Sequence, residues 1–131
     1  MRFPLVVSVI SLVAVTACAA SSAEGPSRTA LAFTKAVTGA DGTAACGLLA
    51  PGTRHELESS SGMPCAKGVL DQQLPTSARV GGSERYGDEA RVVLDHDTTF
   101  VARFSIGWRV VAAGCTDRGK DHPYGCIIKG G

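Results

Sequence analysis

Cysteines are the feature of this sequence that most restricts its fold. The chain of 131 residues contains five, and four of them, Cys46, Cys65, Cys115 and Cys126, lie well beyond an apolar N-terminal stretch. In an exported domain four cysteines most simply form two disulfides, although three pairings are possible. Their order favours Cys46 with Cys65 and Cys115 with Cys126, because each pair closes a local loop. A zinc site or a redox pair would need close spacing such as C-x-x-C, which these cysteines lack.

The N-terminal segment has the layout of a secretory signal. Arg2 supplies positive charge, and the stretch from Leu5 to Ala17 is apolar except for two serines and a threonine. A transmembrane helix needs about 20 apolar residues, which this stretch does not reach. We therefore expect residues 1–17 to be a signal peptide that is removed.

Cys18, the remaining cysteine, directly follows this stretch. The sequence VTAC at 15–18 resembles the lipobox of bacterial lipoproteins, in which a lipid is joined to the cysteine thiol and the chain is cut before it. The alternative is an ordinary cleavage site, ACA at 17–19 or SSA at 21–23, which would leave Cys18 lost or incidental and the protein secreted. The lipoprotein hypothesis predicts lipidation of Cys18, a flexible tether over 18–27 and a domain held on the outer face of the cell membrane.

Charge and length restrict the function of the folded part. One of the 13 basic residues lies in the signal segment, so the rest of the chain carries 12 basic and 12 acidic residues. This balance, without any basic run, excludes an ordinary nucleic-acid-binding surface. The length after the signal fits one domain, expected over residues 28–131, and no cofactor motif is present.

The first half of the domain is predicted to be helical. Apolar residues recur at helical spacing after Ser27, a capping residue, and GADG at 39–42 ends this helix. Asp41 or Thr43 can start a second helix, which Pro51 terminates. Helices are therefore expected over residues 28–38, 44–50, 53–60 and 65–74.

The second half is predicted to form strands, because β-branched and aromatic residues gather in short runs separated by turn residues. Strands are expected over residues 79–86, 89–95, 98–104 and 108–115. In the last two, neighbours such as Phe100 and Val101 should face opposite sides of the sheet, one toward a core and the other toward solvent or a pocket. Residues after Cys115 are expected to form a tail pinned by its disulfide.

Helices followed by an antiparallel meander indicate an α+β domain with the helices on one face of the sheet. The runs ALAFTKAVTGADGTAACGLLAPGTRHEL, CAKGVL and GDEARVVLDHDTTFVARFSIGWRVVAAGC resemble small secreted or lipid-anchored actinobacterial domains of the NTF2-like (cystatin-like α+β) superfamily. The resemblance covers about residues 28–115. It implies a cone, in which a curved sheet of about four strands wraps around helices, often with a cavity. It implies little about activity, because the superfamily includes isomerases, dehydratases and binding proteins.

Three aromatic residues are candidates for a pocket or a partner contact. Trp108 could line a cavity or be the largest core side chain. His122 and Tyr124 fall in the disulfide-bounded tail, and exposed loops on a rigid frame often carry recognition.

The other polar clusters are expected to be structural. Asp95, His96 and Asp97 form the densest group of potential ligands, but strand neighbours point to opposite faces and Asp favours turns. His55 lies among charged residues of a short helix, and the serines at 59–61 lack the G-x-S-x-G context of a nucleophile. The sequence therefore predicts no metal site and a non-catalytic binding or accessory module for a small apolar ligand or a protein partner. The alternative is an isomerase-like or dehydratase-like enzyme with an acid/base pair in the cone.

Overall fold

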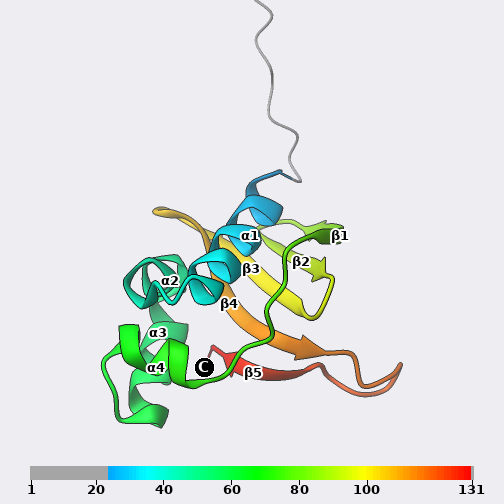
Figure 1. Ribbon diagram of the computed structural model, residues 1–131. Helices are drawn as coiled ribbons and strands as arrows, with labels where there is room; N and C mark the ends of the chain where they lie inside the picture. The colour runs from blue at the N-terminus through cyan, green and yellow to red at the C-terminus, as the bar shows by residue number, and fades with distance from the viewer. Residues whose placement is uncertain (1–23, 131) are drawn as a thin grey trace, which may run out of the picture.

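Helices occupy the first half of the described chain and strands the second half, as the sequence predicts. The computed structural model describes residues 24–130. The helices are α1 (Glu24–Thr38), α2 (Gly42–Leu48), α3 (Pro51–Ser61) and α4 (Cys65–Asp71). The strands are β1 (Val80–Tyr86), β2 (Glu89–Leu94), β3 (Thr98–Phe104), β4 (Gly107–Thr116) and β5 (Gly125–Lys129). The sheet is an antiparallel meander in the order β1-β2-β3-β4-β5, with the helices on one side (Figure 1).

All four helices form where predicted, but their boundaries shift by up to four residues, with α2 and α3 each beginning two residues early. α1 begins at Glu24, so Ser27, the predicted cap, lies in its first turn, and residues 24–27 of the expected tether are helical. α1 ends at Thr38, before GADG, and the carboxylate of Asp41 then caps α2 by accepting from the Ala44 N–H at 3.1 Å. Pro51, expected to terminate that helix, is instead the first residue of α3. α4 ends at Asp71, three residues before the predicted end at 74.

The core lies between α1 and the sheet. Ala30 and Phe33 of α1 are buried, as are Val92, Val101 and Val110 of the three central strands. Neighbouring residues of a strand point to opposite faces of the sheet. Since these valines lie under the helices, the residues next to them in each strand lie on the outer face of the sheet.

The predicted alternation holds for Phe100 and Val101 of β3. In β4 it is wrong, because an irregularity in the pairing with β3 places Val110 and Ala113 both in the core and leaves Val111 and Ala112 between them partly exposed.

The Cys115–Cys126 disulfide pins the tail to the end of β4 as predicted, but the prediction of about four strands is one too few, because residues 125–129 of this tail form β5. It pairs antiparallel with the end of β4, and Cys126 lies directly opposite Cys115 with 3.9 Å between their Cα atoms. This cross-strand pair extends the sheet by one short strand. The described sheet does not show the curled cone that the resemblance implies.

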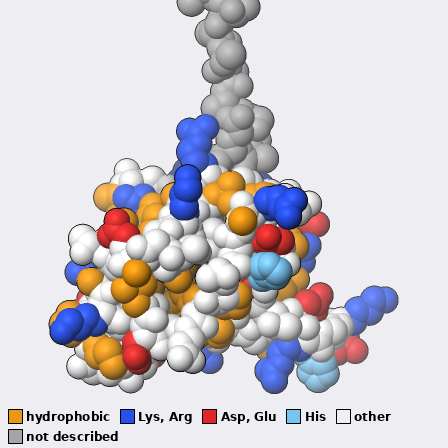
Figure 2. Space-filling model, in the orientation of Figure 1, with side chains coloured by type: hydrophobic (Ala, Val, Ile, Leu, Met, Phe, Trp, Pro, Cys, Tyr) orange, Lys and Arg blue, Asp and Glu red, His pale blue; other side chains and the backbone are white. Residues whose placement is uncertain are grey.

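The described chain begins at one end of the molecule, which we call the hairpin end. This end comprises the first turn of α1 (25–28), the β1–β2 turn (85–89) and the β3–β4 hairpin (103–109). α1 and the β3–β4 hairpin reach it together at the top of Figure 1. Basic side chains gather there, with hydrophobic side chains between them (Figure 2).

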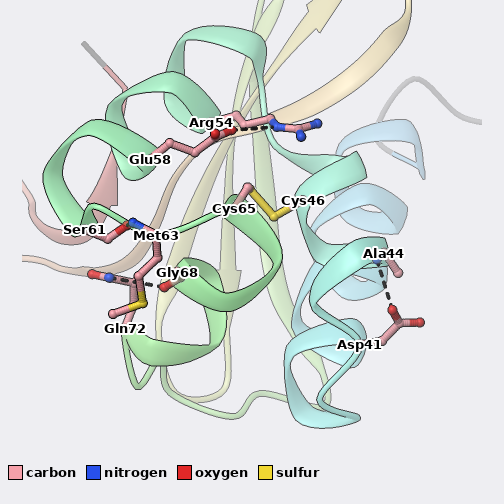
Figure 3. Close-up of a disulfide and its surroundings, with 10 residues drawn as sticks. All are labelled: Asp41, Ala44, Cys46, Arg54, Glu58, Ser61, Met63, Cys65, Gly68 and Gln72. Atoms are coloured by element: carbon pink, nitrogen blue, oxygen red, sulfur yellow. Dashed lines mark hydrogen bonds and ion pairs between the residues drawn. A yellow bond between two sulfur atoms is a disulfide. The ribbon is translucent and has the colours of Figure 1, made fainter.

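Both disulfides pair as the sequence predicts. Cys46 of α2 joins Cys65 of α4 (Figure 3), and Cys115 joins Cys126. Three of the four cysteines are buried. Stable disulfides are characteristic of oxidising compartments, so the pair indicates an extracytoplasmic domain. Within residues 24–130 no helix has the length and apolar character needed to cross a membrane.

Candidate ligand-binding groove

An aromatic groove lies on the outer face of the sheet. Arg91 and Phe100 are paired in register on β2 and β3, next to the core residues Val92 and Val101. Strand alternation therefore turns Arg91 and Phe100 away from the helices. Tyr124, from the end of the β4–β5 loop, packs edge-on against Phe100 with 5.1 Å between ring centroids. The groove has a volume of about 650 Å³, and its aromatic lining residues are Tyr86, Phe100, Phe104 and Tyr124.

A hydrogen-bonded network holds the polar side of the groove. The Arg91 guanidinium donates to the Glu84 carboxylate at 2.7 Å and to the Tyr124 hydroxyl at 3.1 Å. The Tyr86 hydroxyl also donates to Glu84. Arg91 thus ties β2 to β1 and to the β4–β5 loop, which fixes Tyr124 over Phe100.

The network shifts two pKa values in opposite directions. The hydrogen bond from Tyr86 and the positive charge of Arg91 lower the pKa of Glu84. The same hydrogen bond to Glu84 raises the pKa of Tyr86. Glu84 is therefore a carboxylate and Tyr86 a neutral phenol at pH 7. Both shifts move away from neutrality, whereas a general acid or base works best with a pKa near the operating pH.

The other wall of the groove forms where two segments share the edge of β4. Leu49 bridges to Val110, and the Ala50 N–H donates to the Val110 carbonyl at 2.8 Å. At the next residue of β4, the Val111 carbonyl accepts a hydrogen bond from the Thr53 hydroxyl at 3.0 Å. From Ala112 onward, β4 pairs with β5. The start of α3 and the end of β5 therefore meet at the groove, where Thr53 and Lys129 line it.

The structure separates the three predicted contact residues. Tyr124 lines the groove. Trp108 is partly buried against the core and packs beside Gly25 at the start of α1, on the opposite face of the sheet. His122 is exposed in the β4–β5 loop, where its N–H donates to the Gly119 carbonyl. These residues do not form one site, and Cys18 lies outside the described residues.

The acidic cluster at 95–97 has a structural role. Asp95 accepts from the backbone N–H groups of Ala78 and Arg79. Asp97 accepts from the Ser77 hydroxyl at 2.8 Å and from the Gly114 N–H at 3.0 Å. Both carboxylates thus attach neighbouring segments to the β2–β3 turn. Across the described part of the chain, no group of three or more His, Cys, Asp or Glu residues could hold a metal ion.

Two other polar features lie apart from the groove. His55 is exposed on α3, and residues 59–61 form the last turn of that helix. Neither feature lines the groove. Neither Arg91 nor Phe100 belongs to a sequence motif that predicts a site. The signal that could have found them is the pairing of the two strands, which puts Phe100 of β3 opposite Arg91 of β2 with both side chains facing away from the helices.

Comparison with protein-family models, with curated proteins and with solved structures gives no match. No family is identified by these comparisons, so the NTF2-like resemblance stays a prediction.

Proposed function

We propose that this chain is a lipid-anchored extracytoplasmic protein that binds a small amphipathic ligand in the aromatic groove, without catalysing a reaction. The anchor is the lipobox-like sequence ending at Cys18, and the two disulfides support export. The observation that carries the binding role is the groove itself, in which four aromatic side chains lie on the face of the sheet that the helices leave open. The NTF2-like resemblance belongs to the same proposal, supported by a helical layer on an antiparallel meander.

The lining favours a ligand with a flat apolar body and an acidic group. Phe100 and Tyr124 present aromatic surface that such a body can cover. Arg91 is already neutralised by Glu84. Lys129 lines the opposite wall and has no ion-pair partner among residues 24–130, so its ammonium is the group that would meet an anion. The directions of the pKa shifts of Glu84 and Tyr86 support binding over proton transfer.

A fluorescent probe with this chemistry tests the groove. Anilinonaphthalene sulfonate has an aromatic body and one negative charge. It should bind the Cys18→Ala variant, which carries no lipid on that residue and needs no detergent. Lys129→Gln should weaken binding several-fold, and Phe100→Ala should weaken it further. Ile127→Ala is the matched control, because Ile127 is exposed but lies outside the groove. Equal affinity in all four proteins would exclude the groove as the site.

The anchor has a separate test. The mass of the mature protein should include a diacylglycerol on Cys18, and the protein should partition with membranes. Cys18→Ala should release it into the medium. A mature chain without lipid, or a Cys18→Ala variant that still partitions with membranes, would contradict the anchor and leave the groove proposal intact.

A further inference from the structure

The hairpin end combines aromatic and basic side chains in one cluster. Trp108 lies so close to the start of α1 that a Cβ on Gly25 would be 2.7 Å from its indole nitrogen. The guanidinium of Arg85 stacks on the same indole, 5.1 Å from the ring centroid. Arg103 at the base of the β3–β4 hairpin is paired with Asp88 at 2.6 Å. The start of α1, the β1–β2 turn and the β3–β4 hairpin are thereby joined into one surface.

This surface also exposes large apolar side chains. Ile106 at the hairpin tip is 57% exposed, Phe104 39% and Tyr86 61%. In the register of the hairpin Phe104 pairs with Gly107, so Ser105 and Ile106 form a two-residue turn. Gly107, with a φ of 107°, takes the left-handed conformation that this bend needs, so the positions of Ser105 and Ile106 do not require Gly or Asn. An isoleucine at this tip gains nothing from turn geometry and exposes apolar surface to water, which requires another explanation.

The chain that precedes α1 limits where this surface can lie. Six residues, Cys18 to Ala23, separate the proposed lipid from the first residue of α1. Even fully extended, six residues span only about 20 Å. If the lipid is present, the hairpin end is therefore the part of the domain held nearest to the lipid headgroups.

We propose that the hairpin end docks on the phospholipid surface, with Ile106 inserted between headgroups and the neighbouring arginines against lipid phosphates. This inference rests on the proposed lipid anchor. This end carries the four arginines Arg28, Arg85, Arg103 and Arg109 against two acidic residues, Asp88, which pairs with Arg103, and Glu89, so its net charge is positive. Tryptophan, tyrosine and arginine side chains are suited to a membrane interface, because each combines an apolar body with a polar tip. Docking orients the aromatic groove relative to the membrane instead of leaving the domain free on its tether.

Trp108 is the only tryptophan in the chain, so its fluorescence reports on this end alone. The mature lipoprotein is reconstituted into vesicles of phosphatidylcholine and phosphatidylglycerol containing a nitroxide-headgroup lipid. Docking predicts strong quenching of Trp108. Ile106→Asp should lower the ratio of docked to undocked domain by about tenfold, because it replaces a buried aliphatic group by a charge. Ile127→Asp, at an exposed position on β5 near the other end, should quench like the wild type.

The outcomes separate the two proposals. Mass spectrometry on the same samples establishes whether Cys18 carries lipid, and its absence would refute the anchor. A lipidated chain whose Trp108 is unquenched would overturn docking and leave the hairpin tip available to a protein partner. Equal quenching in the Ile106→Asp and Ile127→Asp variants would also overturn it.

Discussion

Gly42 lies at the start of α2, where that helix meets α4, and its replacement by alanine is expected to destabilise the domain. A Cβ at this position would lie 1.9 Å from the carbonyl oxygen of Ala66, whereas ordinary contact begins near 3.4 Å. The two helices would have to separate by about 1.5 Å to restore that contact. The obstacle is backbone, so no side-chain rotation can relieve it.

The cost follows from how firmly the two helices are joined. The Cys46–Cys65 disulfide links α2 to α4 with 6.0 Å between the Cα atoms, so they cannot move apart freely (Figure 3). Overpacking typically costs about 1–3 kcal/mol. Alanine recovers up to about 1 kcal/mol of helix propensity relative to glycine. Because the clash is with backbone, the upper end of the overpacking range applies, and we expect a net loss of about 2 kcal/mol, equivalent to a fall in Tm of about 8 °C for a domain of this size.

Gly47→Ala provides a control in the same helix. Gly47 is exposed, and a Cβ there would meet nothing within 4 Å. This variant should gain about 0.5–1 kcal/mol from helix propensity alone. Urea unfolding followed by circular dichroism, with the disulfides intact, measures both changes as shifts of the midpoint at constant slope. The reasoning is refuted if Gly42→Ala proves as stable as Gly47→Ala.

Four further changes test other parts of the structure. Replacing Cys46 and Cys65 together by alanine should cost about 3 kcal/mol in urea unfolding, because the disulfide closes a loop with a sequence separation of 19; an unchanged midpoint would contradict this. Ala40→Gly should raise stability by about 1 kcal/mol in the same assay, because Ala40 adopts the left-handed conformation with φ 55° after α1. Thr53→Val should cost about 1 kcal/mol through the lost bond to the Val111 carbonyl, which keeps its bond from the Gly130 N–H. Because the pKa of Glu84 is lowered from 4.5, its stabilising effect is present above pH 4.5 and is lost as the pH falls through the lower folded-state value. Glu84→Gln should therefore flatten the dependence of Tm on pH below 4.5, and an unchanged slope would exclude this contribution.

Local chemistry explains which parts of the fold could be predicted. The stop after Thr38 and the cap at Asp41 depend on residues within one turn of each other. The disulfide pairing follows chain order, because each pair closes a short loop. β5 escaped prediction because five residues carry too little periodicity, and its pairing with β4 comes from the Cys115–Cys126 contact across the sheet. The first turn of α1 could not be predicted, because its residues show no apolar pattern. In the structure this turn packs on β4, where Gly25 lies against Trp108.

The candidate site, like the fold, could be predicted from the sequence only in part. The sequence alone determined the α+β class and the two disulfides, since each depends on composition or on neighbours in the chain. Tertiary structure decided that Tyr124 and Phe100 share a groove with Arg91 while Trp108 lies on the other face of the sheet. It also decided that the start of α1 and two hairpin turns form one surface. Both results depend on strand register, in which a shift of one residue reverses the face of every side chain, and register is set by packing between segments distant in the sequence.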